Sequence, residues 1–496
     1  MSTPTNLPPL QLDKTSGEAL FTQLYGAIKT AILQGAMAPG MQLPPSRTLA
    51  RHLGVSRQTV VNAYEQLTAE GYLDCCVGRG SFVSEGLPPR RPRTAHRQPD
   101  PAIGIRPLSS RGRLFIEPAL RMGTQDGPPK AFRSGMAALE TFPFDTWARL
   151  EARCWRKPHA PLGYSDPAGF MPLRELLSAH LRVTRGIRCD PEQVIITSGA
   201  QQAVHLTGQL LLNPGDKVWV ENPGYRGARL ALRAAGAELV PVPVDADGLR
   251  VEDGLAAAPR ARLAYVTPSH QYPLGVTMGL PRRLALLDWA ERHQAWIIED
   301  DYDSEYRYTG PMLASLQSLD RAGSVLYIGT LSKSLFPGLR LGYLVVPPAL
   351  VDAFRQGKSA VDRMSPVMPQ AVLTEFIAGG HFHRQIKRTR ELYDERRRVL
   401  LQELQRQLGT AMTAGPSNAG LQLAVAFRDH RIDDQAFAKA AAAKDIEVRA
   451  LSSFYAADER NASLPAEASG LLLGFACVPT RHMRPGVGVL KALMNA

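Results

Sequence analysis

The segment TLSKSLFPGLRLGY, residues 330–343, is the most informative part of the sequence for the fold. It directly follows the apolar run SVLYIG at 324–329. A short apolar run of this kind predicts a buried strand, so Lys333 is expected just beyond a strand end. A lysine held there among small hydroxyl residues can form a Schiff base once its surroundings deprotonate its amine. A lone lysine is ordinarily a solvated charge, so the flanking segments decide between the two interpretations.

An acidic segment, IIEDDYDSEY at residues 297–306, lies upstream of this lysine. A strand ending here would deliver Asp300 to the carboxyl edge of a sheet, where ligands bind in open α/β folds. A carboxylate there could hold a pyridine nitrogen protonated, and Tyr302 could hydrogen-bond the ring phenolate. A metal site or a solvated loop are the alternatives for such a cluster. The spacing from Asp300 to Lys333 permits a helix-containing crossover between their strands.

A third segment, TSGAQQA at residues 197–203, combines a strand end, a glycine turn and a helix start. The first N–H groups of a helix have no intrahelical partner and can bind a phosphate. An arginine seven residues after Lys333 could complete a phosphate clamp, and the tyrosine of ENPGYRG could stack on a ring. The residues expected to contribute are Gly199, Ala200, Gln201, Arg340 and Tyr225.

From about residue 130 onward, short apolar runs alternate with helical stretches. The strand-like runs are EQVIITS, DKVWVEN, ELVPVPV, RLAYVTP, AWIIED, SVLYIG and LGYLVVP. Such alternation predicts a mostly parallel sheet with helices on both faces, so the expected class is α/β.

The first 86 residues follow a different pattern, with apolar residues on one face of a first helix that Pro39-Gly40 would end. Ser46 can cap the short helix SRTLARHL, and Ser56 can cap the next helix, SRQTVVNAYEQLTAEG. Gly78-Arg79-Gly80 then indicates a hairpin. Two helices joined by a tight turn are typical of a helix-turn-helix, whose second helix enters the major groove. There an arginine can pair with guanine, and a glutamine with adenine.

The string LPPSRTLARHLGVSRQTVVNAYEQLTAEGYLDCCVGRGSFV, residues 43–83, closely resembles the winged-helix domain of GntR-type bacterial regulators. The resemblance implies a double-stranded DNA operator as a partner. The implied contacts are Arg47, Ser56, Arg57, Gln58, Thr59, Gly78 and Arg79.

The glycine-turn segment, ENPGYRG, the acidic segment and the lysine segment, in this order along the chain, resemble the fold-type I aminotransferases. This resemblance implies pyridoxal 5'-phosphate (PLP) as the cofactor, with Lys333 carrying it, Asp300 on the pyridine nitrogen and Tyr302 on the phenolate. Thr330 matches a phosphate ligand, and Tyr164 matches a phosphate contact that is made across a homodimer.

A winged helix, a linker and an aminotransferase-like domain together resemble the MocR/GabR regulators. The expected domains are a winged helix-turn-helix at 15–85, a linker at 86–113 and a PLP-binding effector domain at 114–496. The linker concentrates positive charge, with seven arginines and six prolines in residues 87–113 of a chain whose net charge is +12. We expect a solvated tether there, and contact with DNA phosphates is the alternative.

The resemblance implies a cytoplasmic transcriptional regulator that senses a small amine, an amino acid or PLP itself through an aldimine on Lys333. It would contact RNA polymerase if it is an activator. A catalytically competent aminotransferase carrying a DNA-binding domain is the alternative, and a passive homodimeric binding protein whose cofactor only stabilises the fold is a third reading. We expect sensing rather than sustained turnover, with weak or half-reaction transamination left open.

Two departures from the aminotransferase pattern concern the effector. In TPSHQYPLG, Tyr272 takes the place of an asparagine that usually bonds the ring oxygen. His270 and Gln271 beside it are candidate effector contacts, with polar packing as the alternative. On the last strand, Leu472 takes the place of the arginine that binds the substrate carboxylate. Arg449 could serve instead, or could be a surface charge.

Composition excludes several other classes. The chain has 496 residues and is 44% hydrophobic, as an ordinary globular protein is. No apolar run reaches the roughly 20 residues of a membrane span, and the first residues show no secretory signal. Five cysteines without a C-x-x-C pair indicate reduced thiols. His381 and His383 have no accompanying ligand pattern, so no metal site is expected.

Overall fold

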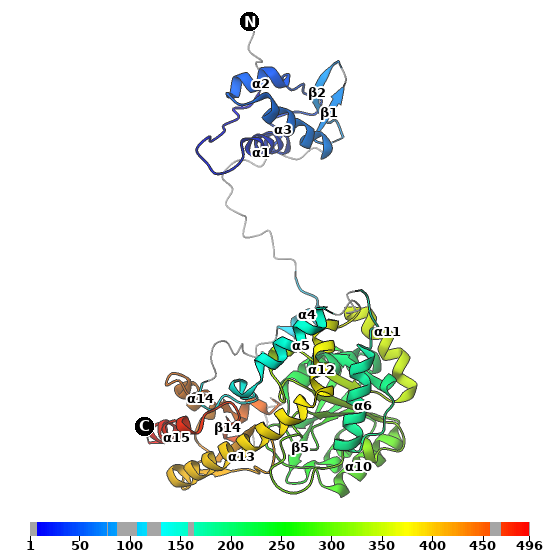
Figure 1. Ribbon diagram of the computed structural model, residues 1–496, viewed down its shortest axis with the longest axis vertical. Helices are drawn as coiled ribbons and strands as arrows, with labels where there is room; N and C mark the ends of the chain where they lie inside the picture. The colour runs from blue at the N-terminus through cyan, green and yellow to red at the C-terminus, as the bar shows by residue number, and fades with distance from the viewer. Residues whose placement is uncertain are drawn as a thin grey trace. The chain divides into compact units, whose positions relative to one another are not determined.

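The protein is described from a computed structural model that covers residues 7–76, 78–86, 107–116, 130–156, 163–456 and 468–495. The chain divides into an N-terminal unit, Met1–Pro107, and a C-terminal unit, Leu108–Ala496 (Figure 1). Most of the predicted linker at 86–113 lies outside the described residues. Its last residues belong to the C-terminal unit, because helix α4 (Ser110–Phe115) begins inside the predicted linker range.

The N-terminal unit consists of three helices and a hairpin, as predicted for a winged helix-turn-helix. The elements are α1 (Leu20–Leu33), α2 (Ser46–Leu53), α3 (Arg57–Ala69), β1 (Leu73–Cys76) and β2 (Gly80–Val83). The two strands pair antiparallel from Leu73 opposite Val83 to Cys76 opposite Gly80. Leu24, Ile28 and Leu67 lie in its core, fully buried.

The turn between α2 and α3 agrees with the sequence prediction, whereas the start of α2 and the end of α1 differ from it. Gly54 is left-handed (φ 63°) at the end of α2, and Ser56 accepts a hydrogen bond from the Thr59 N–H at 3.0 Å. The prediction that Ser46 caps α2 is wrong, because Pro45 occupies the N-cap and no side chain caps the helix. Helix α1 ends at Leu33, before the predicted stop at Pro39-Gly40.

The C-terminal unit is built on an eight-stranded sheet whose order is β3-β10-β9-β8-β7-β4-β5-β6. The strands from β9 to β5 run parallel, and β10 and β6 are antiparallel to their neighbours. The predicted α/β class with a mostly parallel sheet is therefore confirmed. The strands are β3 (Val194–Thr197), β4 (Lys217–Asn222), β5 (Glu238–Asp245), β6 (Gly248–Leu249), β7 (Leu263–Val266), β8 (Trp296–Asp301), β9 (Val325–Thr330) and β10 (Gly342–Val345).

Helices cover both faces of this sheet (Figure 1). On one face, α7 (Ala200–Leu211), α8 (Arg226–Ala234) and α11 (Val351–Asp362) bury residues such as Val204 and Phe354 against the strands. The other face packs against α5 (Phe144–Arg156), α6 (Met171–Arg185), α9 (Val251–Ala257), α10 (Leu280–His293), α12 (Val367–Ala378) and α13 (His381–Leu408). Consecutive residues of a strand therefore pack into different hydrophobic cores, one on each face of the sheet.

The connection from β8 to β9 does not use the helix that the spacing would permit. Between Asp301 and Val325 the chain forms only the 3-10 turn Gln317–Leu319. Buried Glu299 holds this connection, accepting from the Leu316 and Gln317 N–H groups at 2.8 Å each. The Glu299 side chain on β8 therefore holds the connection in place through hydrogen bonds to its backbone.

A second, four-stranded antiparallel sheet, in the order β11-β12-β14-β13, lies nearer the C-terminus. Its strands are β11 (Met412–Ala414), β12 (Gln422–Phe427), β13 (Arg449–Ala450) and β14 (Gly470–Gly474), and α14 (Asp434–Ala442) and α15 (Thr480–Met494) accompany them. Within the part of the chain that the structure describes, no helix is both long and apolar enough to span a membrane.

Candidate cofactor site and nucleic-acid interface

Lys333 follows the carboxyl end of β9, as its sequence position predicts. Its Nζ donates to the backbone oxygen of Gly135 at 2.5 Å. Burial lowers the pKa of this amine, and the carboxylates of Asp303 and Asp300 partly oppose the shift. A lysine in these surroundings gives up its proton more readily than a solvated one.

Asp300 is the last residue but one of β8 and has 4% of its surface exposed. Its Oδ2 accepts from the Tyr265 hydroxyl at 2.5 Å, whereas its buried Oδ1 has no hydrogen-bond partner among the described residues. Burial raises the pKa of this carboxyl to about 7, although the Tyr265 hydrogen bond and Lys333 act in the other direction. A buried acceptor without a donor is costly, and a protonated pyridine nitrogen is a donor that would satisfy it. These residues therefore fit the cofactor.

The start of α7 supplies the anion-binding element. Gly199 is its N-cap with φ 115°, a conformation that L side chains rarely adopt, so the glycine is required here. A Cβ on Gly199 would lie 3.8–3.9 Å from the Arg340 guanidinium, which places that cation beside the helix start. Gln201 donates its side-chain amide to Gly227 O at 2.8 Å. Thr330, which ends β9, is buried. Exposed N–H groups and an arginine together suit a phosphate.

Aromatic side chains converge next to Lys333 and Asp300. The ring of Tyr272 lies edge-on to three others, with centroids 6.0 Å from Tyr225, 5.7 Å from Tyr302 and 5.3 Å from Phe454. The Tyr225 hydroxyl donates to Gln201 Oε1 at 3.3 Å, which holds its ring at the start of α8. Tyr272, noted in the sequence as a departure, is thus the centre of an aromatic wall.

His270 lies behind this wall and contacts Tyr302. Its Nδ1 is 2.9 Å from the Tyr302 hydroxyl and 3.1 Å from both carboxylate oxygens of Asp303. The imidazole is 4% exposed, and a Cβ on Gly420 would collide with it at 2.0 Å. The structure therefore places His270 where it can set the position of the Tyr302 hydroxyl.

Gln271 is 1% exposed and uses its amide within the surrounding loops. Its Nε2 donates to Glu221 Oε2 at 3.2 Å, to Pro223 O at 2.9 Å and to Tyr272 O at 2.7 Å. These bonds correspond to the polar-packing alternative that the sequence left open for this residue.

Arg449 lies directly opposite Leu472 in the register of β13 and β14. It is half-buried, its Nη1 donates to the Tyr272 hydroxyl at 3.1 Å, and its guanidinium lies 4.8 Å from the Phe454 ring centroid. The surface-charge alternative for Arg449 therefore does not hold. Arg449 on β13 therefore presents a guanidinium beside Leu472, the position on β14 where the carboxylate-binding arginine of the aminotransferases is missing.

Tyr164 lies apart from these residues within the chain. Its side chain is 82% exposed, and the Arg363 guanidinium sits 4.2 Å from its ring centroid. An exposed tyrosine held by a cation is available to another molecule, as a contact across a dimer would require.

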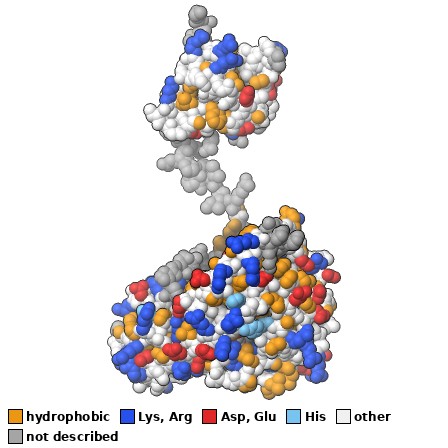
Figure 2. All heavy atoms as spheres, viewed as in Figure 1, with side chains coloured by type: hydrophobic (Ala, Val, Ile, Leu, Met, Phe, Trp, Pro, Cys, Tyr) orange, Lys and Arg blue, Asp and Glu red, His pale blue; other side chains and the backbone are white. Residues whose placement is uncertain are grey.

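In the N-terminal unit, the predicted DNA contacts are mostly exposed. Arg57 and Gln58 begin α3 and face solvent, while Thr59 is half-buried and 2.9 Å from Ser56 Oγ. Arg47, in α2, is exposed, and so are Gly78 and Arg79 at the hairpin turn. Basic side chains are visible on this unit in Figure 2. Both elements of the predicted winged helix therefore present polar and cationic groups.

Sequence reasoning missed several residues of the site. Tyr265, Gly135 and Asp303 all contact the predicted residues, yet each comes from a separate segment of the chain. Tyr265 and Asp303 carried a weak signal, since one lies in a predicted strand next to the β8 strand and the other within the acidic segment. Gly135 carried none. No group of three His, Cys, Asp or Glu side chains in the described ranges could hold a metal ion.

The comparisons with known proteins match both units. The family of class I and II aminotransferases matches residues 136–465, and the gntR family of bacterial regulatory proteins matches residues 20–83. The chain is 39% identical to the probable rhizopine catabolism regulatory protein MocR of Rhizobium meliloti, over 98% of this chain and 96% of that protein. It is 32% identical to the pyridoxine biosynthesis transcriptional regulator PdxR of Corynebacterium glutamicum, covering 83% and 84%.

Among solved structures, the chain resembles the kynurenine aminotransferase of Pyrococcus horikoshii in complex with PMP. The TM-score is 0.67 at 28% identity, covering 79% of this chain and 95% of the enzyme.

Proposed function

Because the chain belongs to the MocR/GabR-type regulators, which join a GntR-type domain to an aminotransferase class I and II domain, we propose that it is a PLP-dependent transcriptional regulator. One observation carries the proposal. The open, buried Oδ1 of Asp300 lies near Lys333 in a chain that also presents Arg57 on a recognition helix. The first unit binds an operator in double-stranded DNA, and the second senses a small molecule.

Different residues of the C-terminal unit are suited to bind different parts of PLP. When bound, PLP supplies an aldehyde carbon that condenses reversibly with primary amines, and a ring that withdraws electrons. Burial keeps more of the Lys333 amine neutral and nucleophilic. Asp300, positioned by Tyr265, would accept from the ring nitrogen through its open Oδ1. The residues that would hold the phosphate, the ring face and the phenolate are Gly199, Ala200, Gln201, Thr330, Arg340, Tyr225, Tyr302 and, from a partner subunit, the equivalent of Tyr164.

The Lys333–Gly135 hydrogen bond ties the sensing amine to an early segment of the C-terminal unit, residues 130–156. The bond is available only while Lys333 Nζ points at this carbonyl. An effector that changes the state of Nζ thereby changes what restrains Gly135, and we propose that DNA binding responds to this change.

The effector that best suits the site is a primary amine that also carries a carboxylate. Arg449 presents a half-buried guanidinium on the aromatic wall, and a carboxylate is its matched partner. His270 acts through Tyr302, and Gln271 acts by fixing the loop that carries Tyr272. Because Arg449 comes from β13 rather than β14, the carboxylate is held from a different direction than in enzymes with an arginine on the last strand. This difference favours sensing over rapid turnover.

The regulator acts as a homodimer in the cytoplasm. An exposed Tyr164 supports a two-fold assembly of the C-terminal unit. Two winged helices then bind half-sites separated by whole helical turns of about 34–36 Å, and an activator would also contact RNA polymerase.

An absorbance titration of the full-length holoprotein against a panel of amines and amino acids tests the sensing function. We expect amine-bearing carboxylates to shift the cofactor band, and Arg449→Ala to remove the preference for them over plain amines. Sustained production of oxo acid at the rates of an aminotransferase would instead identify the chain as a working enzyme.

Binding to duplex DNA tests the other function. Arg57→Ala should cost about 1–3 kcal/mol in binding the preferred sequence if the side chain makes a bidentate guanine contact. Arg79→Ala should weaken binding to all sequences alike and reduce the salt slope by roughly one. A sequence-selective loss from Arg79→Ala would mean that the hairpin reads bases.

A further inference from the structure

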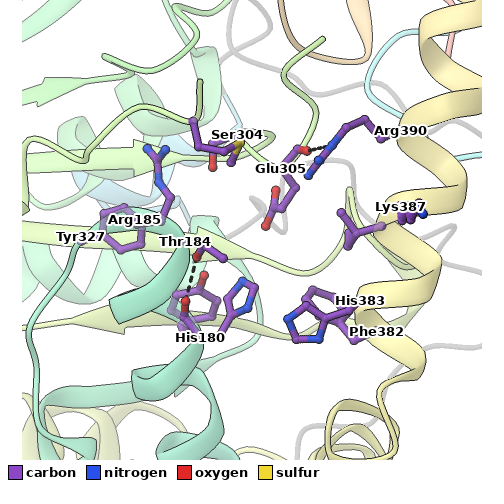
Figure 3. A pocket seen from close by; sticks show the side chains of 13 residues that line it. His180, Thr184, Arg185, Ser304, Glu305, Tyr327, Phe382, His383, Lys387 and Arg390 are labelled. Carbon is purple, nitrogen blue, oxygen red and sulfur yellow. Dashed lines mark hydrogen bonds between the residues drawn. The ribbon is translucent and has the colours of Figure 1, made fainter. Parts of the chain in front are cut away.

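A cavity of about 270 Å³ lies in the C-terminal unit between α6, α13 and the chain that follows β8 (Figure 3). One water needs only ~10–15 Å³, and sites for small molecules begin near ~300 Å³. None of the residues assigned to the PLP site lines it. It is lined by His180, Arg185, Glu305, His383, Lys387 and Arg390, among others. The cavity is therefore a second space of metabolite size, separate from the site of Lys333.

Glu305 directs its carboxyl group into this cavity, as Figure 3 shows. Within the described chain, no other residue donates a hydrogen bond to that carboxyl, which faces only its own backbone N–H. Burial raises its pKa to about 7, with the nearby Asp301 carboxylate adding to the shift. Arg390 does not neutralise it, since its Nε donates to the Glu305 backbone oxygen at 2.8 Å. The carboxyl is thus an open acceptor at the inner part of the cavity.

His180 also lines the cavity and adds no charge to it. Burial lowers the pKa of this imidazole to about 4, so the ring is neutral near pH 7. Its ring packs edge-on against His383, with centroids 5.5 Å apart. Among the described residues that line the cavity, Glu305 is the one acidic side chain, so a cationic group is what would pair with it.

The opposite wall of the cavity is cationic. His383, Lys387 and Arg390 follow one another at helical spacing, so they share one face of α13. Lys387 is exposed and has no carboxylate within ion-pair distance in the described part of the chain. The backbone hydrogen bond of Arg390 fixes its guanidinium at the wall. The cavity therefore has an acidic inner part and a basic rim.

We propose that this cavity binds a small zwitterionic amino acid. Its ammonium group donates to Glu305, and its carboxylate is held by Lys387 and Arg390. A simple anion such as phosphate would leave Glu305 without a donor and bring like charges together. A simple amine would leave the cationic rim unpaired. Only a molecule with both charges satisfies both walls.

Isothermal titration of the full-length protein tests this proposal, after borohydride reduction has fixed PLP on Lys333 and removed its exchange chemistry. The probes are glycine, L-alanine and 4-aminobutanoate, with propionate, propylamine and inorganic phosphate as single-charge controls. We expect at least one amino acid to bind in a 1:1 ratio and each control to bind at least about tenfold more weakly. Binding of propionate, propylamine or phosphate as tightly as the amino acids would overturn the assignment, as would no binding at all.

Two variants locate the site. Glu305→Gln and Lys387→Ala should each weaken amino acid binding about tenfold or more, since each removes one charged contact. Arg388→Ala is the matched control, because Arg388 is an exposed neighbour on α13 that does not line the cavity. Lys387 is itself exposed, so its variant keeps the test valid if Glu305→Gln fails to fold. Unchanged binding in Lys387→Ala would place the amino acid elsewhere, including beside Arg449, and would overturn the proposal.

Discussion

Asp300 and Asp301 are consecutive residues of one strand, yet the two faces of the sheet use them in opposite ways. Asp301, on the face of α6 and α13, forms an ion pair with Arg185 at 2.7 Å and accepts from Tyr327 at 2.6 Å. Asp300, on the face of α7 and α8, accepts only from Tyr265 within the described residues, and its Oδ1 stays open. Burial is nearly equal, at 4% and 6% exposed.

This comparison indicates which of the two buried carboxylates is suited to bind a ligand. A fully paired buried charge, such as Asp301, is part of the structure, and removing it leaves its partner Arg185 uncompensated. A buried carboxylate with an open oxygen raises the free energy of the protein alone, so it is retained where a ligand supplies the missing donor.

The largest expected effect is all-or-none and concerns the face of Asp300. Lys333→Ala removes the amine, so borohydride should no longer trap PLP on the protein. In the wild type, peptide mass mapping should place the reduced cofactor on Lys333. Modification of a lysine on the Asp301 face, such as Lys387, would contradict the assignment of the two faces.

The next effect is on stability and falls on the other carboxylate. Asp301→Asn should lower the free energy of unfolding by about 3–5 kcal/mol, because it removes the carboxylate that forms the ion pair with the buried Arg185 guanidinium. Asp300→Asn should not destabilise the apoprotein, because it removes a buried charge that lacks a full partner. Urea unfolding of both apoproteins at pH 7.5 measures this difference, and equal losses would show that the contrast is false.

The third effect is the pH dependence of that stability. Burial raises the pKa of the Asp300 carboxyl to about 7 in the folded protein, whereas in the unfolded chain it has its ordinary value near 3.8. Between these values the folded state binds the extra proton, so the wild-type apoprotein loses stability relative to Asp300→Asn as pH rises from about 4 to 7. The slope is at most about 1.4 kcal/mol per pH unit. Unfolding both proteins at several pH values tests this, and a stability difference that does not change with pH would contradict it.

The smallest effect compares the two tyrosine donors. Tyr265→Phe removes the only protein donor to Asp300 within the described residues, so PLP retention should weaken and the apoprotein should also lose about 1–3 kcal/mol of folding free energy. Tyr327→Phe removes one of several bonds to Asp301 and should cost about 1–3 kcal/mol of folding with PLP retention unchanged. Equilibrium dialysis of PLP separates the two variants, and thermal unfolding measures both stability losses. Equal loss of PLP in both variants would argue against separate roles.

The sequence predicts the strands and the identity of Lys333 and Asp300 because local apolar runs place both at strand ends. It fails where an element depends on distant contacts. The spacing from Asp300 to Lys333 left the form of the β8–β9 connection open, and buried Glu299 anchors that connection by binding its backbone. The N-cap of α2 is Pro45 rather than the expected Ser46. The pairing of Arg449 with Tyr272 depends on a register between two separate segments, which one sequence does not reveal.

We propose that DNA binding depends on whether the Lys333 amine is free to exchange its bond to PLP, and operator binding measured with and without effector tests this directly. Full-length PLP-loaded protein is titrated with an operator selected from random duplexes, with and without the amine-bearing carboxylate that shifts the cofactor band. The borohydride-reduced protein is titrated in parallel. We predict that the effector changes operator affinity in the native protein and leaves the reduced protein unchanged. An equal response in both proteins, or a band shift without any change in affinity, would contradict the claim.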